Sequence, residues 1–372
     1  MKRTFKYYIK ANKETTKKAN QILELCRILY NLCLEQRQFV WKNYHKSISG
    51  YNQAYELPSL KKFFSEFKEV PSQTLQEVVE RVNRAFQNFF RRVKNGEKPG
   101  YPRFKSFNRY DSFTLKQAGW KLNGNKFQIK KIGSFKLFLS RPIEGDIKTV
   151  TIRKSSTGKW YVTFSCDNVP FKPLPKTGNS IGIDVGCQSF LTTSEGEKVD
   201  NPRFFQRTKK LLVKRQKSLS RKKKGSKRRN KARIFLSKAH EKIFNQRKDF
   251  HFKIARKLLQ AYDTVCIENM DHFKSYRALN RSMRDVAWFN FFNILLFKAE
   301  EAGKMIVKVP AKNTSQACSG CGKIVPKDLS CRVHECPHCG LILDRDINAA
   351  RNILKRGGQL LQGAGALAPA MN

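Results

Sequence analysis

Hydrophobic residues change their spacing several times along the chain, and each spacing predicts a different kind of element. Over residues 3–9, Phe5, Tyr7 and Ile9 alternate with polar neighbours, which predicts a β-strand with one buried face, and we expect it at a sheet edge. A spacing of three to four residues follows over 15–44 and predicts a long amphipathic helix. Its inward positions are Ile22, Cys26, Leu29, Cys33 and Val40, so the two cysteines are expected in the core.

A second amphipathic helix is predicted to begin at Ser72, which follows Pro71 and is of a residue type favoured at the N-cap. From there, apolar residues recur at positions i, i+3, i+4 and i+7, namely Leu75, Val78, Val79, Val82, Phe86, Phe89 and Val93. The pattern ends in the Gly- and Pro-containing segment 95–106, NGEKPGYPRFKS. We therefore predict a helical insertion over residues 13–106.

Residues 112–168 return to a period of two, which predicts short β-strands. Turn sequences at Asn123-Gly124 and Thr157-Gly158 predict two β-hairpins. The apolar residues around them are Phe127, Ile129, Val150, Ile152, Trp160, Val162 and Phe164. We predict a small antiparallel β-barrel made of residues 1–12 and 107–172, in which the N-terminal strand joins the later strands across the helical insertion.

A linker containing Pro, Lys and Gly, residues 171–179, leads into a region where strands and helices alternate. Three strands are predicted close together, at 181–185, at 189–193 and after the turn Glu195-Gly196, and such short separations indicate an antiparallel meander. The predicted elements that follow are a helical stretch over 204–262 with a break at Gly225-Ser226, a strand over 264–267, a helix over 287–302, a strand over 305–309 and a helix over 344–355.

This order of elements suits an RNase H-like architecture for residues 178–313 and 341–356. The predicted fold class is therefore multidomain α+β, with a small barrel and its helical insertion preceding an RNase H-like domain. Residues 357–372 are rich in Gly and Ala, and we expect them to be disordered.

Charge identifies the class of partner. The chain holds 75 Lys and Arg against 29 Asp and Glu, a net charge of +46, and a polyanion would relieve the resulting self-repulsion. A protein that binds an acidic membrane surface needs only a local basic patch, whereas here the excess runs nearly the whole length, so we predict nucleic acid. We find no signal peptide or membrane-spanning segment and expect a monomeric protein in the prokaryotic cytoplasm, acting at the nucleoid.

Basic residues are densest over 201–240, which contain seventeen Lys or Arg and no acidic residue. The predicted phosphate contacts in this segment are Arg221, Lys222, Lys223, Lys224, Lys227, Arg228 and Arg229, although a solvated turn between helices would have the same composition. A second predicted contact is formed by Tyr101, Arg103 and Lys105. The aromatic rings of Tyr101, Phe104 and Tyr110 could either stack on bases or belong to the core.

Three acidic residues lie beside apolar runs at the ends of predicted elements. Asp184 lies in the strand 181–186 (IGIDVG), Glu268 ends the strand 265–268 (VCIE), and Asp346 begins the last helix. A carboxylate in such surroundings is unfavourable unless a cation or a hydrogen-bond donor accompanies it. Each acid alone is more typical of a cap or a turn. Their combination in a strongly basic chain predicts a catalytic centre that hydrolyses phosphodiester bonds.

Asp344 competes with Asp346 for the third position, and helix geometry separates them. Asp344 shares a helix face with Asn348, Arg351 and Lys355, whereas Asp346 shares one with Ala350 and Ile353 and borders Ile347 and Leu354. Asp346 is therefore predicted to face inward, and Asp344 to be the N-cap. Three carboxylates suit Mg²⁺ or Mn²⁺, and two such ions can stabilise the attacking and leaving oxygens together.

Five of the ten cysteines lie between residues 318 and 339. Two C-x-x-C-G sequences pair Cys318 with Cys321 and Cys336 with Cys339, and fourteen residues separate Cys321 from Cys336. This is the spacing of a structural zinc site with four thiolates. The nearby Cys331, His334 and His338 would break the paired spacing and are not expected to bind the ion. We predict a zinc ribbon over 314–340 that helps to position Asp346.

Several segments together resemble the TnpB family, transposon-encoded RNA-guided DNA endonucleases related to type V CRISPR effectors. These segments are 98–106 (KPGYPRFKS), 182–186 (GIDVG), 267–270 (IENM), 314–322 (TSQACSGCG) and 344–352 (DRDINAARN). They span most of the chain in the family's order. The resemblance implies a RuvC-like nuclease domain with Asp184, Glu268 and Asp346 as catalytic residues, preceded by a wedge-like barrel with a helical recognition insertion.

The same resemblance implies two nucleic-acid partners, a guide RNA from the transposon end and a double-stranded target DNA. Two alternatives remain, an RNA-guided repressor that binds without cutting and a transposase that joins strands. The complete set of three acids disfavours the repressor. Their order, Asp, Glu, Asp rather than Asp, Asp, Glu, disfavours the transposase.

Overall fold

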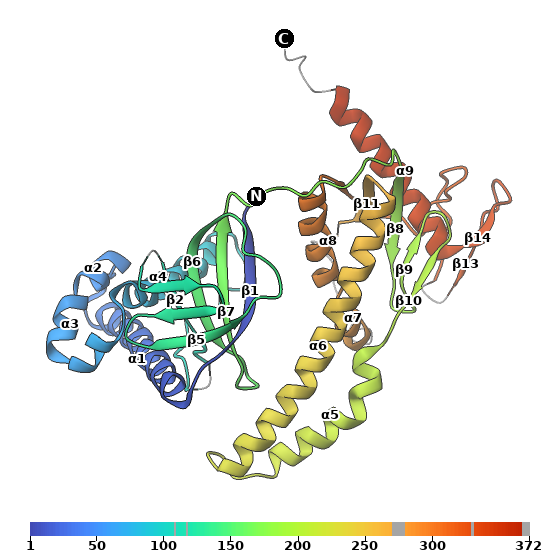
Figure 1. The fold of residues 1–372 in the computed structure, drawn as a ribbon. Coiled ribbons are helices and arrows are strands. Elements are labelled where there is room, and N and C mark those ends of the chain that lie inside the picture. Colours follow the sequence, from blue (N-terminus) through green and yellow to red (C-terminus); the bar gives the residue numbers. More distant parts are fainter. Residues whose placement is uncertain (108, 117, 270–279, 329–330, 367–372) are drawn as a thin grey trace. The chain divides into compact units, whose positions relative to one another are not determined.

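The computed structural model describes residues 1–107, 109–116, 118–269, 280–328 and 331–366. The chain divides into two compact units, Met1–Pro170 and Phe171–Asn372 (Figure 1). Each unit has its own β-sheet and its own hydrophobic core.

The first unit contains a seven-stranded sheet in which all pairs are antiparallel. Its order is β2-β6-β7-β1-β5-β4-β3. The strands are β1 (Arg3–Lys10), β2 (Ser112–Leu115), β3 (Trp120–Asn123), β4 (Lys126–Ile129), β5 (Gly133–Phe138), β6 (Asp146–Lys154) and β7 (Trp160–Asp167). Both predicted hairpin turns are confirmed, and Gly124 and Gly158 adopt the positive φ angles of 54° and 85° that favour glycine there.

Two predictions for this sheet are wrong. The N-terminal strand β1 is central, paired with β7 on one side and β5 on the other. Alternation of side chains reports which faces are buried, not which edges are hydrogen-bonded, so it cannot separate a central strand from an edge strand. Among the described residues, the end strands β2 and β3 do not pair with each other, so the sheet is a half-barrel and not a closed barrel.

The predicted helical insertion is confirmed between β1 and β2. It comprises α1 (Lys13–Tyr44), α2 (Gly50–Tyr55), α3 (Leu57–Phe63), a 3₁₀ turn (Ser65–Glu69) and α4 (Ser72–Lys94). Cys26 and Cys33 are buried in the core that these helices share with the sheet, as predicted. Ser72 is the first helical residue and not the N-cap, and its hydroxyl instead accepts a hydrogen bond of 2.6 Å from Lys61.

The second unit contains a mixed five-stranded sheet with the order β10-β9-β8-β11-β12. Its strands are β8 (Ser180–Val185), β9 (Ser189–Thr193), β10 (Lys198–Asp200), β11 (Thr264–Glu268) and β12 (Met305–Val309). The predicted antiparallel meander is confirmed for β8, β9 and β10. Strands β8, β11 and β12 are parallel, so the carboxyl ends of β8 and β11 meet at one edge of the sheet.

Helices cover both faces of this sheet (Figure 1). They are the C-terminal part of α6 (Lys227–Ala261) with α7 (Asn280–Val286) and α8 (Trp288–Ala302) on one face, and α9 (Arg345–Ala366) on the other, while α5 (Phe204–Ser220) packs along α6. Ile181, Ile183, Val265 and Ile267 face the core formed with α6 and α8. Cys266 faces the opposite side and packs with Ile353 of α9. In the described part of the chain, no helix is both long enough and apolar enough to cross a membrane.

The last helix is longer than predicted. We expected α9 to end near Lys355 and residues 357–372 to be disordered, but α9 continues to Ala366, and residues 367–372 lie outside the described part. Gly357 is buried against β11, where a Cβ atom would lie 2.2 Å from Sγ of Cys266. The Gly-rich composition therefore reflects close packing of the helix on the sheet at this residue, and not a break in the helix.

Candidate functional site

Asp184 and Glu268 lie on neighbouring parallel strands. The register pairs Ile183 of β8 with Ile267 of β11, and the two acids are the next residue on each strand. Adjacent strands are about 4.8 Å apart, so the two carboxylates extend from the same sheet edge beside each other.

Asp346 reaches this edge from the first turn of α9. The helix packs directly on β8 at Gly182, where a Cβ atom would lie 2.2 Å from the carbonyl oxygen of Ala350. Ala350 is one turn beyond Asp346 along the helix. A side chain at position 182 would push α9 away from the sheet, so this glycine helps to bring Asp346 to the two strand acids.

The charges of the other two carboxylates act on Asp184. Burial raises the pKa of Asp184 well above its usual value, and the negative charges of Glu268 and Asp346 raise it further. The guanidinium of Arg345 opposes that rise. Buried like charges are unfavourable without a compensating cation, and carboxylate oxygens are the donors that Mg²⁺ and Mn²⁺ prefer. The donor set therefore fits a hard divalent metal ion.

Glu268 has a neutral partner that the sequence did not identify. The hydroxyl of Thr314 donates a hydrogen bond to Oε1 of Glu268, and Thr314 is buried with 2% of its surface exposed. Burial raises the pKa of Glu268, while the hydrogen bond from Thr314 and the charge of Arg356 oppose that rise. The same arginine donates to the carbonyl oxygens of Pro310 and Lys312, at 2.9 and 2.7 Å, which fixes the chain leading to Thr314.

Asp344 is the N-cap of α9, as predicted. One of its carboxylate oxygens accepts hydrogen bonds from the backbone N–H groups of Asp346 at 2.9 Å and Ile347 at 3.2 Å. Its other oxygen lies 2.6 Å from the ammonium of Lys198. These contacts occupy Asp344, and Asp346 lies nearer the strand acids.

The four predicted zinc ligands form a compact cluster. Their sulfur atoms lie within 4.8 Å of one another, with Cys318 and Cys339 3.6 Å apart and Cys321 and Cys336 also 3.6 Å apart. Tetrahedral zinc with bonds of about 2.3 Å places its sulfur ligands about 3.8 Å apart, so the cluster fits the ion. Gly322 and Gly340 follow the second cysteine of each pair with φ angles of 80° and 70°, as the tight turns require.

The ribbon contains the short strand β13 (Val333–Glu335), which pairs with β14 (Ile342–Asp344) just beyond the ribbon, and β14 leads directly into α9. Cys331 is exposed and its thiol donates to the carbonyl oxygen of Val333 at 3.1 Å. His334 is fully buried beside the ammonium of Lys327, and His338 is exposed. The structure places these three residues outside the sulfur cluster.

Two asparagines join the ribbon to α9, a role that was not predicted from the sequence. The side chain of Asn348 accepts from the backbone N–H of Ser319 at 2.9 Å and donates to the carbonyl oxygen of Ala317 at 2.7 Å. The amide of Asn352 donates to the carbonyl oxygens of Thr314 and Ala317. We had assigned Asn348 to a polar helix face, but it is completely buried. Two asparagines spaced four apart among Ala and Ile residues were the available signal.

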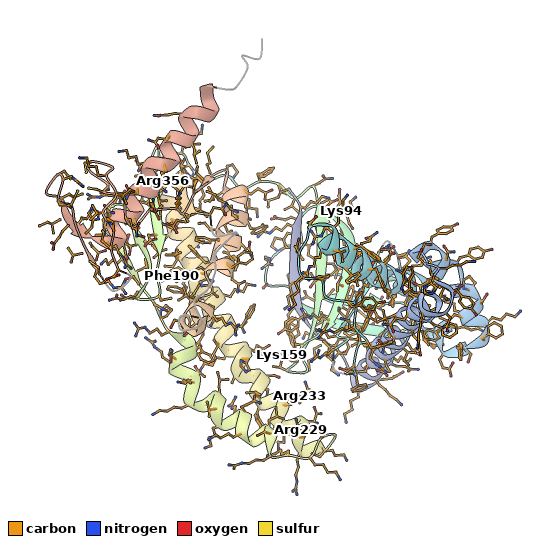
Figure 2. All side chains as sticks on the ribbon, turned by 180° about the vertical axis from the view of Figure 1, so that it is seen from behind. Lys94, Lys159, Phe190, Arg229, Arg233 and Arg356 are labelled. Atoms are coloured by element: carbon orange, nitrogen blue, oxygen red, sulfur yellow. The ribbon has the colours of Figure 1, made fainter. Side chains whose placement is uncertain are left out.

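The predicted basic contact lies at the turn between α5 and α6, where Figure 2 labels Arg229. Arg221, Lys223, Lys224, Lys227 and Arg228 are exposed there. Arg229 and Lys222 are half-buried and have internal partners. Arg229 donates to the carbonyl oxygens of Leu219 and Lys222, at 2.9 and 2.8 Å, so it caps the end of α5.

The residues of the second predicted contact and the aromatic residues near them differ in exposure. Tyr110 is buried in the core, which decides its role, whereas Phe104 and Arg103 are exposed. Tyr101 is 45% exposed and packs edge to face on Phe86 and Phe89 with ring centroids 5.7 and 5.3 Å apart. The backbone N–H of Lys105 donates to Asn31 at 2.8 Å, so this loop is held on α1.

Comparison with known proteins places the chain in a family. Residues 157–277 match the family model OrfB_IS605, described as "Probable transposase". Residues 288–353 match "Cas12f1-like, TNB domain", and residues 1–46 match "Helix-turn-helix domain". A Streptomyces pristinaespiralis protein named "Putative RNA-guided DNA endonuclease" is 33% identical, over 96% of this chain and 90% of that protein. The chain belongs to the TnpB family of RNA-guided DNA endonucleases.

Other relatives agree with this placement. "TnpB-like protein L79" of Acanthamoeba polyphaga mimivirus is 32% identical over 60% of this chain and 46% of that protein. "CRISPR-associated endodeoxyribonuclease Cas12f1" of Sulfoacidibacillus thermotolerans is 25% identical over 59% of this chain and 56% of that protein. The solved "Structure of the mini-RNA-guided endonuclease CRISPR-Cas_phi3" aligns with a TM-score of 0.56 at 9% identity, covering 96% of this chain and 92% of that chain, and this likeness is one of fold.

Proposed function

We propose that this TnpB-family protein is an RNA-guided endonuclease that hydrolyses DNA phosphodiester bonds at Asp184, Glu268 and Asp346. The observation that carries the proposal is the convergence of these three partly buried carboxylates, from β8, β11 and α9, in a chain with a net charge of +46. The mixed sheet, with an antiparallel meander beside parallel strands and α9 across one face, supports an RNase H-like, RuvC-like nuclease domain.

The chemistry follows from the donor set. Two bound divalent ions would supply Lewis-acid stabilisation of the attacking and leaving oxygens. Asp184, Glu268 and Asp346 would hold the ions, and the burial of Asp184 and Glu268 leaves those two carboxylates poorly hydrated and available as ligands. Thr314 orients Glu268, and Arg345, whose Nε lies 3.5 Å from Oδ1 of Asp346, offsets part of the negative charge.

Zinc at the four cysteines would be structural, because four thiolates leave no open coordination position. The ribbon binds α9 through Asn348 and Asn352 and reaches Glu268 through Thr314. Its proposed function is therefore to position two of the three catalytic carboxylates.

A guide RNA and a double-stranded DNA target are the proposed partners. Base pairing would supply sequence specificity, while basic side chains bind phosphates irrespective of sequence. The exposed cations at the α5–α6 turn are suited to the second task. Sequencing of RNA that copurifies with the protein tests whether a guide RNA supplies the specificity. The absence of a discrete RNA would favour an unguided nuclease.

Single substitutions test the catalytic assignment. Asp184→Ala, Glu268→Ala and Asp346→Ala should each abolish Mg²⁺-dependent cleavage of a guided target while target binding persists. Asp249→Asn is the matched control, because Asp249 is an exposed acid of α6 that pairs with Lys253 at 2.8 Å. Cleavage that survives the Asp184 substitution would contradict the assignment, and binding without cleavage by the unsubstituted protein would favour an RNA-guided repressor.

A further inference from the structure

A pocket of about 420 Å³ lies between α5 and α6, apart from the three carboxylates and the ribbon. Helix α5 contributes Leu211, Lys214, Arg215 and Ser218, and α6 contributes Arg228, Lys231, Ala232 and Phe235. Within each helix these residues recur every three or four positions, so they form the two facing sides of the helical hairpin. This size lies in the usual range for small-ligand sites.

The floor of the pocket is apolar and incompletely filled. Ala232 is buried and carries no side chain beyond Cβ, which leaves space between the helices. Leu211 and Phe235 border that space and remain 42% and 46% exposed. The hydrophobic cluster of this hairpin, Leu212 with Ala239 and Ile243, does not include them. Part of the Phe235 ring is therefore accessible beside the space, and the ammonium of Lys238 lies 6.0 Å from the centroid of that ring.

The rim of the pocket is cationic. Lys214, Arg228 and Lys231 have no acidic partner among the described residues, and residues 201–240 contain no acid at all. Two other cations that line the pocket donate hydrogen bonds within the hairpin itself. Arg215 donates to the carbonyl oxygen of Phe235 at 2.6 Å, which fixes the backbone beneath the ring, and Lys222 donates to Ser218.

We propose that this pocket binds one unpaired nucleotide of a nucleic-acid strand, with its base on Phe235 and its phosphate at the Lys214, Arg228 and Lys231 rim. An anion alone would use the rim and leave the aromatic floor without a function, whereas a nucleotide uses both. A base within a duplex has both faces covered by its neighbours, so an unpaired nucleotide is required. The proposal deepens the proposed function, on which it rests for the presence of a nucleic-acid partner.

Crosslinking locates the nucleotide directly. Full-length protein carrying Asp184→Ala would be irradiated, without divalent metal, with short oligonucleotides containing 4-thiouridine or 4-thiothymidine, and the crosslinked peptides identified by mass spectrometry. We expect a crosslink at or beside Phe235 with the RNA, the DNA or both. The double substitution Lys214→Gln and Lys231→Gln should remove it. The equally charged change Lys242→Gln and Lys248→Gln, at exposed residues of α6 outside the pocket, should leave it in place.

Affinity measurements test the stacking. Phe235→Ala should weaken binding of an unpaired oligonucleotide roughly fivefold or more, because stacking of a base on an aromatic ring typically has at least that effect. Phe235→Trp should retain binding, which separates loss of the ring from misfolding. Phe244→Ala is the control, since Phe244 is a 56% exposed phenylalanine of the same helix outside the pocket.

Three outcomes would overturn the proposal: no crosslink near Phe235 with either oligonucleotide, equal effects of the Phe235 and Phe244 substitutions, or equal binding of abasic and base-containing strands by the pocket. The last would indicate a phosphate site alone. Failure of the catalytic assignment is distinguishable, because it is measured as DNA cleavage, whereas these measurements require none.

Discussion

Thr314 donates its hydroxyl hydrogen bond to Glu268, and this contact links the zinc ribbon to the sheet. Thr314 lies at the start of the ribbon segment, four residues before Cys318, and its own carbonyl oxygen accepts from Asn352 of α9 at 2.9 Å. One buried residue thus contacts the strand that bears Glu268 and the helix that bears Asp346. The ribbon is positioned to affect both acids.

Loss of the Thr314 hydroxyl should therefore reduce metal binding. We expect Thr314→Val to lower the apparent Mg²⁺ affinity or cleavage rate roughly 10- to 100-fold, which is typical of partners that orient metal ligands. Thr314→Ser keeps the hydroxyl and should restore most activity. A Mg²⁺ titration of cleavage for both variants is the measurement. A larger loss in Ser than in Val would point to lost methyl packing and contradict the orienting role, because valine keeps the methyl group that serine lacks.

Zinc removal should loosen the second unit locally. Chelation, or Cys336→Ser, is expected to increase amide exchange over 314–344 and at the start of α9, and to lower cleavage, while exchange in residues 1–170 stays unchanged. Cys331→Ser is the matched control, because Cys331 lies outside the sulfur cluster. Hydrogen exchange read by mass spectrometry, with zinc content measured in parallel, checks this. Unchanged exchange around Asn348 and Thr314 after zinc loss would separate the ribbon from the catalytic carboxylates.

Residues whose environment is set locally were predictable from the sequence. Asp344 as the N-cap, Gly124 in a hairpin turn and the paired cysteines of the ribbon each depend on a few neighbouring positions. Contacts across long separations were not. The central place of β1 depends on strands more than one hundred residues later, and the role of Thr314 depends on Glu268, 46 residues earlier. Spacing along a chain carries no information about such partners.

The exposed cations at the α5–α6 turn should contribute to the salt dependence of binding. The triple substitution Lys223→Gln, Lys224→Gln and Lys227→Gln should weaken DNA or RNA binding and lower the slope of log K against log salt, by up to about 0.9 per lost duplex phosphate contact. Anisotropy titrations between low and moderate salt measure the slope. Arg229→Gln should mainly lower stability, because it removes two hydrogen bonds to carbonyls at the end of α5. An unchanged slope in the triple variant would place that turn away from the interface.

Two adjacent glycines test the extended α9. At Gly357 an added Cβ would lie 2.2 Å from Sγ of Cys266, whereas at Gly358 nothing lies within 4 Å. Gly357→Ala should destabilise the second unit by about 1–3 kcal/mol through overpacking. Gly358→Ala should stabilise it by about 0.5–1 kcal/mol, since alanine is the better helix former. Thermal unfolding of the two variants compares them. Equal effects of both substitutions would contradict a helix that continues through these residues against β11.

His251 should make the second unit sensitive to acid. Its ring is buried beside Phe190, with centroids 5.3 Å apart, and Nε2 lies 3.1 Å from the carbonyl oxygen of Val286. Burial lowers the pKa of His251 to about 4, and the charge of Arg247 adds to the effect, while the hydrogen bond with Val286 opposes it. The unfolded chain has the ordinary pKa near 6.5, so it binds the proton more readily than the folded chain.

The stability from a neutral His251 is therefore complete above about pH 6.5 and is lost as the pH falls towards 4, by at most roughly 3 kcal/mol. His251→Gln does not titrate and can still donate to Val286. We expect it to be less stable than the parent protein at pH 7.5 but to lose less stability between pH 7 and pH 5. Urea unfolding at a series of pH values gives both slopes. If the two slopes are the same, His251 has the same pKa in the folded and unfolded chains, and the acid sensitivity arises elsewhere in the unit.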